Sequence, residues 1–137
     1  MVVLPPRYSR RLFRSSWLTV ISILVSFQLG LYVNTVLTSM VLISSCNYWR
    51  NPVFGWSRKF DQVSVGFVFF CQSWMIQWCS SPYHVGYALA NCLAFSCYYF
   101  ARCSENQNHS SLCHCMIHVC ANAANLSLYF GISTFNQ

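Results

Sequence analysis

The sequence predicts an all-α fold, a multi-pass transmembrane helical bundle of about four helices. Of its 137 residues, 55% are hydrophobic and only 7% are charged, whereas a soluble domain carries about 25% charged residues. The only acids are Asp61 and Glu105, against eight Lys and Arg, which is too few for a salt-bridged soluble surface. Four long apolar runs also recur between short polar breaks. Lipid is therefore the expected solvent for most of the chain.

Residues 1–16 form a basic N-terminal flank that holds four of the eight basic residues and no acid. We interpret this flank as a positive segment that keeps the N-terminus in the cytosol. A cleaved secretory signal and a mitochondrial presequence are alternatives, because the segment is rich in Arg and precedes an apolar run. Against the signal, the apolar run continues past the usual length of roughly 7–15 residues without a clear cleavage site.

The first apolar run, residues 17–46, is 30 residues long. At about 1.5 Å per residue, one helix of this length exceeds a hydrocarbon core of about 30 Å. We therefore expect one long, tilted or broken membrane helix over about 18–46. Gln28, Gly30 and Asn34 mark its weak point.

Three further membrane helices are predicted, at about 60–79, 82–101 and 110–131. Pro82 suits the first turn of a helix, and Gly131 suits a helix end. The predicted organisation is one transmembrane domain over 17–131 and a short C-terminal tail over 132–137.

Four crossings would put both termini on one side of the membrane. Arg50, Arg58 and Lys59 would then face away from the basic flank, so the charges leave the orientation open. The basic residues lie before the first apolar run and in the breaks between the runs, which is how membrane proteins place charge. Nucleic acid is therefore not an expected partner.

A polar stripe lies on the last predicted helix. His114, His118, Asn122 and Asn125 are spaced by four, four and three residues, so they share one helix face. Unpaired imidazole and amide groups in lipid cost several kcal/mol, and the stripe should therefore face protein. Two interpretations stand beside each other: interhelical hydrogen bonds that join helices, and metal ligation.

An up-and-down arrangement brings three chemical groups to one membrane face. Ser44 ends the first predicted helix, Asp61 opens the second, and the two histidines begin the fourth. Imidazole pairs suit zinc, and an aspartate serves as a third ligand or orients zinc-bound water. The predicted site therefore has His114, His118 and Asp61 as metal ligands, with Asp61 alternatively orienting the bound water and the Ser44 hydroxyl close by.

These residues carry a family resemblance. Ser44-x3-Tyr48, Asp61 and His114-x3-His118 resemble the motifs of the superfamily of alkaline ceramidases and progestin and adipoQ receptors. That superfamily is described as seven-helix membrane proteins that bind zinc, several of which hydrolyse lipid amides. The resemblance implies zinc on the two histidines, a site hydroxyl at Ser44 and a water-polarising Asp61. This chain departs from the pattern in having about four helices, and Tyr48 or Trp49 stands where a third histidine is expected.

Other motifs allow milder interpretations. The nine cysteines lie mostly within the apolar runs, where a free cysteine behaves as a small hydrophobe. Asn108-His109-Ser110 matches an N-glycosylation acceptor, which requires a lumenal loop. The segment at 47–61 reads NYWRNPVFGWSRKFD, and its aromatic and basic residues suit the headgroup level, as an anchor or as a phosphate binder.

The sequence thus predicts an integral membrane protein, with an endomembrane favoured, that contacts lipids. One functional hypothesis is a zinc-dependent hydrolase-like site for lipid amides. The second is a noncatalytic protein that acts through helix association, as a homo-oligomer or with another membrane protein. The third is an unselected reading frame.

Overall fold

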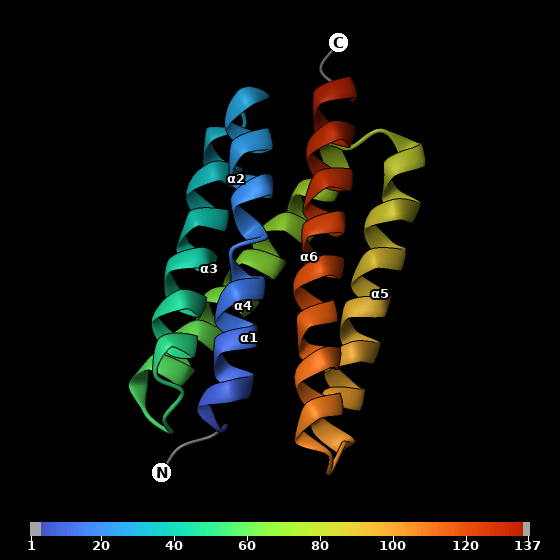
Figure 1. Cartoon of the computed structure of the whole chain (residues 1–137). Coiled ribbons are helices and arrows are strands. Elements are labelled where there is room, and N and C mark those ends of the chain that lie inside the picture. The colour runs from blue at the N-terminus through green and yellow to red at the C-terminus, as the bar shows by residue number, and fades with distance from the viewer. Residues whose placement is uncertain (1–3, 136–137) are drawn as a thin grey trace.

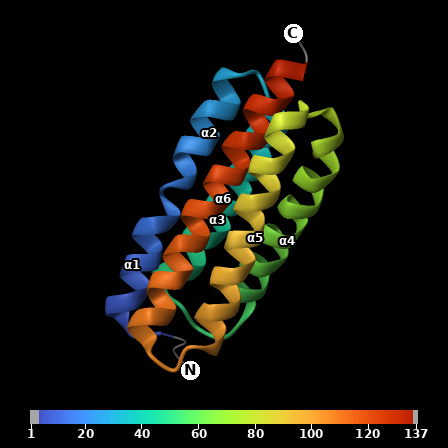
Figure 2. The same ribbon diagram turned by 90° about the vertical axis from the view of Figure 1, so that its right-hand side faces the viewer.

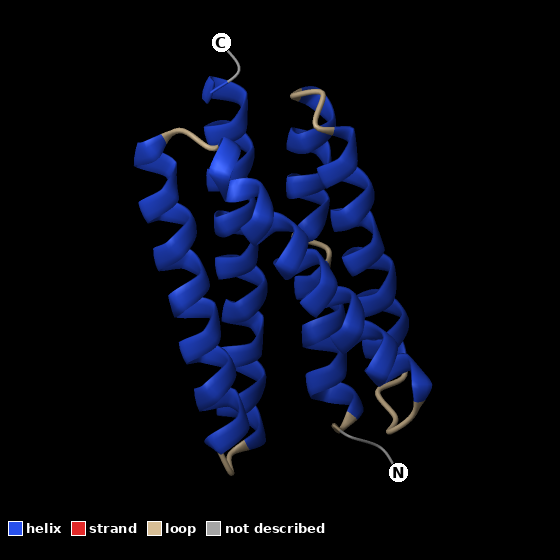
Figure 3. Ribbon diagram, turned by 180° about the vertical axis from the view of Figure 1, so that it is seen from behind, coloured by secondary structure: helices blue, strands red, loops and turns tan. Residues whose placement is uncertain are grey.

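The computed structural model describes residues 4–135, and these residues form helices joined by short loops, without a strand (Figures 1 and 3). This confirms the predicted all-α class. The first three residues of the predicted flank and the last two of the predicted tail lie outside the described residues. The elements are α1 (Pro6–Ser16), α2 (Thr19–Gln28), α3 (Tyr32–Arg50), α4 (Trp56–Met75), the 3₁₀ turn η1 (Ile76–Trp78), α5 (Ser81–Cys103) and α6 (Gln107–Phe135).

Helices α1 and α2 form one kinked rod. At the kink, the N–H groups of Trp17 and Leu18 donate to carbonyls three residues back, at 3.2 and 3.1 Å, in the 3₁₀ pattern. The basic segment is therefore the lower half of a helix, and α1 packs against α3 and α6 (Figure 2).

A sharp reversal at Gly30 separates α2 from α3. Gly30 has φ 72°, in the left-handed region that glycine adopts most easily. The N–H of Leu31 closes the turn on the carbonyl of Ser26 at 2.9 Å. The predicted weak point is correct, but the expectation of one crossing is wrong: the first apolar run folds back as a hairpin of α2 and α3, because the turn lets both halves bury polar side chains against each other.

The reversal changes the topology of the whole chain. The rod of α1 and α2 rises, α3 descends, α4 rises, α5 descends and α6 rises (Figure 1). The chain therefore traverses the bundle five times instead of four. Pro6 and Phe135, the outermost helical residues, lie at opposite ends, which corrects the prediction that both termini share one side.

The last two helices show one confirmed and one wrong boundary. Pro82 lies in the first turn of α5, as predicted. Gly131, predicted to end a helix, lies inside α6, which continues to Phe135. A Cβ atom at Gly131 would overlap Cys79 Sγ and lie 2.8 Å from Tyr83 Cβ. Glycine is therefore needed here for close packing rather than for a helix end.

Two clusters of buried apolar side chains hold the bundle together. Helices α5 and α6 have the most extensive contact, and Leu128 and Tyr129 are fully buried on the α6 side of it. A smaller cluster, near the other end, joins Leu12 of α1 to Tyr48 and Trp49 of α3. Among the described residues, only α6 is both long and apolar enough to cross a membrane by length and composition. Of the four predicted membrane helices, this finding supports only the last, at about 110–131.

Candidate functional site

The acid predicted for the site meets the predicted hydroxyl. Asp61 lies in the second turn of α4, and Ser44 lies in the last two turns of α3. The hydroxyls of Ser44 and Ser45 both donate to Asp61 Oδ1, at 3.1 and 2.6 Å. All three side chains are buried. Two hydroxyl donors on one carboxylate oxygen offset part of the cost of burying that group and tie α3 to α4.

The predicted histidine pair packs against the end of α3, where its ring contact is with Trp49. The ring of His114 meets the ring of Trp49 edge-on, with centroids 5.0 Å apart. The rings of His114 and His118 are 5.6 Å apart, one turn from each other on α6. This three-ring stack joins α3 to α6, and its position agrees with the prediction that the stripe faces protein.

The stack also holds two unpartnered polar atoms. Trp49 Nε1 and His118 Nε2 are both buried and have no hydrogen-bond partner. A buried polar group without a partner costs about 1–3 kcal/mol. The stack is therefore a locally destabilised part of the interface between α3 and α6.

Of the three predicted metal ligands, His114 and His118 lie next to each other. Within residues 4–135, no group of three or more His, Cys, Asp or Glu side chains is arranged to hold a metal ion. A catalytic zinc site uses three protein ligands and an open fourth position. The described geometry offers the pair His114 and His118, and zinc binding by this pair with Asp61 stays a prediction.

The centre of the bundle contains a polar hub that the sequence did not single out. The hydroxyl of Tyr129 on α6 lies 2.6 Å from Thr38 Oγ1 on α3 and accepts from Gln72 Nε2 on α4 at 3.3 Å. All three side chains are buried. One phenol thus joins three helices. The only available signal was the presence of a Gln within the apolar run of α4.

Further side-chain hydrogen bonds connect other pairs of neighbouring helices. Ser22 of α2 donates to Asn122 Oδ1 of α6, and Asn122 in turn donates to the carbonyl of His118 at 2.7 Å. Ser26 and Thr35 join α2 to α3 at 2.9 Å, and Ser73 and Tyr87 join α4 to α5 at 3.1 Å. Each rising or descending segment therefore forms at least one side-chain hydrogen bond with a neighbouring segment.

The segment at 47–61 lies at the surface only in part. Tyr48 and Trp49, at the end of α3, are buried in a cluster with Leu12, so the prediction is wrong for these two aromatic residues. The loop between α3 and α4 and the first turn of α4 do carry aromatic and basic side chains at the surface. The Arg58 guanidinium lies over the Phe54 ring, 4.8 Å from its centroid. Phe54 and Trp56 are exposed.

All nine cysteines are free. Cys79 and Cys120 are buried, as expected of small hydrophobes, whereas the other seven are half-buried or exposed.

Comparison with protein-family models, with curated proteins and with solved structures finds no match to this chain. The resemblance to the ceramidase and adipoQ receptor superfamily stays a prediction that depends on the quoted residues alone.

Proposed function

We propose that this chain is a multi-pass integral membrane protein that acts without catalysis, through helix association. One observation carries the proposal: the bundle has polar residues inside and large apolar residues outside. By length and composition, α6 is the candidate membrane span. The proposal is that all five segments that traverse the bundle cross the membrane, and we call these segments the five passes.

The interior is unusually polar for a protein of this size. Among the described residues, buried polar side chains are as numerous as buried hydrophobic ones. They occur on α1, α2, α3, α4 and α6, whereas α5 buries only Tyr87, Ala90 and Ala101. The buried polar side chains include Ser22, Ser26, Asn34, Thr38, Ser44, Ser45, Asp61, Ser64, Gln72, Ser111 and Asn122. Membrane helices associate through small and polar side chains of this kind, because lipid supplies no hydrophobic force between apolar faces.

The outer surface has the opposite character. Large apolar side chains spaced by three or four residues form exposed stripes, for example Val63, Phe67, Phe70 and Trp74 on α4 and Val85, Leu89 and Leu93 on α5. In a soluble bundle, a stripe with this spacing faces the core. An exposed apolar surface that covers several helices favours contact with lipid or with other membrane helices.

Inward polar residues lower the mean hydropathy of α3 and α4, which contributes to α6 alone qualifying by composition among the described residues. Averaging hydropathy over a helix counts the polar side chains that meet other helices together with the apolar side chains that face outward. The lengths of α3, α4 and α5 suit a span, with 19, 20 and 23 residues, which at about 1.5 Å per residue is close to a hydrocarbon core of about 30 Å.

The charges support one orientation. All eight basic residues lie at the end of the bundle that contains the start of α1, which we call the basic end: Arg7, Arg10, Arg11, Arg14, Arg50, Arg58, Lys59 and Arg102. The opposite end, at Gly30, Ser80 and the end of α6, has no Lys or Arg. The hairpin thus removes the conflict seen in the sequence, since it returns Arg50 and Arg58 to the side of the basic flank. By the positive-inside rule, the basic end faces the cytosol.

Glycosylation mapping in microsomes tests this topology. The native acceptor at Asn108 lies in the first turn of α6, at the basic end, and we expect it to stay unmodified. An acceptor tag added after Gln137 should be glycosylated, and one added before Met1 should not. Modification of both terminal tags, or of neither, would contradict five passes. Release of the protein from membranes by alkaline carbonate would contradict membrane insertion itself.

The zinc hydrolase hypothesis gives a different result in a second measurement. If the protein acts through helix association, protein purified without chelator should contain little zinc. The zinc content should then be the same in the His114→Ala and His118→Ala variants. About one zinc per chain that is lost in both variants would favour the hydrolase-like site instead. The Ser44–Asp61 contact supports either function, because it is both an interhelical bond and a hydroxyl beside an acid.

A further inference from the structure

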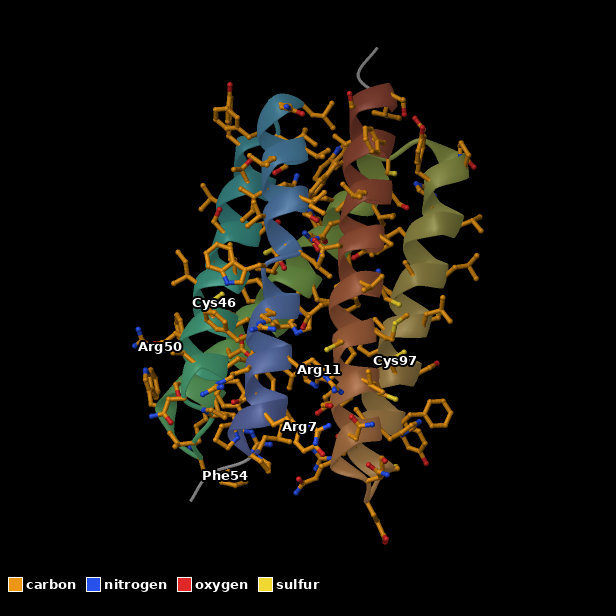
Figure 4. The ribbon with its side chains drawn as sticks, in the orientation of Figure 1. Arg7, Arg11, Cys46, Arg50, Phe54 and Cys97 are labelled. Atoms are coloured by element: carbon orange, nitrogen blue, oxygen red, sulfur yellow. The ribbon has the colours of Figure 1, made fainter. Side chains whose placement is uncertain are left out.

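The basic end contains a surface cavity that is open to solvent and lined by arginines of one helix. Arg7, Arg10, Arg11 and Arg14 are spaced by three, one and three residues, which places them on one face of α1. They line a cavity of about 420 Å³. Figure 4 shows Arg7 and Arg11 on the lower half of α1, in the direction of α6.

The chain has almost no acid with which to neutralise these four charges. Asp61 is buried beneath two serine hydroxyls, and Glu105 is the only other acid. Like charges four residues apart on one helix destabilise it. An external anion in the cavity would remove this repulsion.

Part of the arginine face is held in place before any ligand binds. Arg11 Nη1 donates to Asn108 Oδ1 and to Ser111 Oγ on α6, both at 3.0 Å. The guanidinium carbons of Arg7 and Arg11 lie 5.6 and 5.9 Å from the centroid of the Tyr8 ring. Side chains that are already ordered lose less entropy when they bind.

A second cavity adjoins the first and has an apolar side. It measures about 260 Å³, shares Arg10 with the first, and is also lined by Pro6, Ser9, Phe13, Trp49 and Arg50. Aromatic and basic side chains occur together at the headgroup level of membrane proteins. The two cavities thus offer guanidinium groups for an anion and an adjacent aromatic wall for the less polar part of the same molecule.

We infer that the four-arginine cavity binds the phosphate monoester headgroup of an anionic phospholipid. A monoester offers three acceptor oxygens and carries about −1.5 to −2 charges at neutral pH, whereas a diester offers two unesterified oxygens and one charge. Arginine forks pair two donors with phosphate oxygens, so four guanidinium groups match the richer acceptor. A lipid also uses the aromatic wall, which free phosphate does not. The inference rests on the proposed membrane location, with the basic end at the cytosolic surface.

Binding to the full chain in neutral detergent tests the inference, with native mass spectrometry as the readout. The probes are phosphatidic acid, phosphatidylglycerol, phosphatidylcholine and inorganic phosphate. We expect phosphatidic acid to bind at least about tenfold more tightly than phosphatidylglycerol, on the strength of its added charge. Equal binding of these two lipids would overturn the monoester assignment. Displacement of the lipid by millimolar inorganic phosphate would assign the cavity to soluble phosphate.

A pair of matched triple variants locates the site. The cavity variant combines Arg7→Gln, Arg10→Gln and Arg14→Gln and leaves the anchored Arg11 in place. The control combines Arg58→Gln, Lys59→Gln and Arg102→Gln, which removes the same charge from the same end but outside the cavity. We expect a loss of phosphatidic acid affinity of about 100-fold in the first and about tenfold or less in the second.

Equal losses in the two triple variants would show that only diffuse charge attracts the lipid. The corresponding Arg→Lys triple keeps the charge but loses the forked donors, and it should bind with intermediate affinity. Carbonate extraction of every variant reports membrane insertion independently. Failure of insertion therefore contradicts the proposed function, whereas insertion without selective binding contradicts only the lipid site.

Discussion

Removing one oxygen atom from the polar hub should weaken the whole bundle. Tyr129→Phe deletes the hydroxyl that lies 2.6 Å from Thr38 Oγ1 and 3.3 Å from Gln72 Nε2. The ring stays, so no cavity forms and the loss is confined to hydrogen bonding. Tyr129 is fully buried, and Thr38 and Gln72 are almost as inaccessible. Water therefore cannot replace the lost partner for either group.

The magnitude follows from those two bonds. Interhelical hydrogen bonds in a membrane protein contribute about 0.6 kcal/mol each on average, so the bonds alone account for roughly 1 kcal/mol. A buried hydroxyl or amide left without a partner adds to this and can bring the cost to about 1–3 kcal/mol. We expect the free energy of unfolding to fall within this range.

Reversible unfolding in mixed micelles of neutral detergent and dodecyl sulfate, followed by circular dichroism, measures the change. Tyr99→Phe is the matched control, because Tyr99 is 64% exposed on α5, and its substitution should change stability by less than about 0.5 kcal/mol. A double-mutant cycle with Thr38→Val should give a coupling energy of about 0.5–1.5 kcal/mol. Zero coupling, or a Tyr129→Phe variant as stable as Tyr99→Phe, would refute the hub.

Three further predictions concern the interior of the bundle and use the same unfolding assay. Gly131→Ala should lower the free energy of unfolding by about 1–3 kcal/mol, because its Cβ would overlap Cys79 Sγ. The control Gly66→Ala, whose Cβ meets nothing within 4 Å, should stabilise α4 by up to about 1 kcal/mol. Equal effects of the two substitutions would contradict close packing at Gly131. Asp61→Asn keeps an oxygen acceptor for the two serine hydroxyls and should lower the free energy of unfolding by less than about 1 kcal/mol. Asp61→Leu leaves both hydroxyls without this acceptor and should lower it by about 1–3 kcal/mol. A Leu variant more stable than the parent would contradict the interhelical role of Asp61. Ser22→Ala, which removes the hydroxyl that α2 donates to α6, should cost about 1 kcal/mol and would be neutral if that bond does not form.

The candidate site was predictable where local spacing and connectivity were sufficient. Ser44 and Asp61 meet because the end of α3 and the start of α4 share one end of the bundle, which a short connection guarantees. The shared helix face of His114 and His118 followed from their spacing of four residues. The partner of that face did not follow, since the ring that meets His114 belongs to Trp49, 65 positions earlier in the sequence.

The sequence by itself determined the all-α class, the approximate places of the helices and the weak point near Gly30, because composition and apolar run length are local properties. Only the tertiary structure decided that the first run reverses at Gly30, that the chain traverses the bundle five times and that its helical ends lie apart. A glycine marks both a kink and a turn, and the choice depends on which polar side chains find partners across the bundle. Tyr129, Thr38 and Gln72 illustrate the same limit: each is an ordinary residue on its own helix, and their common hydrogen-bond hub exists only once three helices lie side by side.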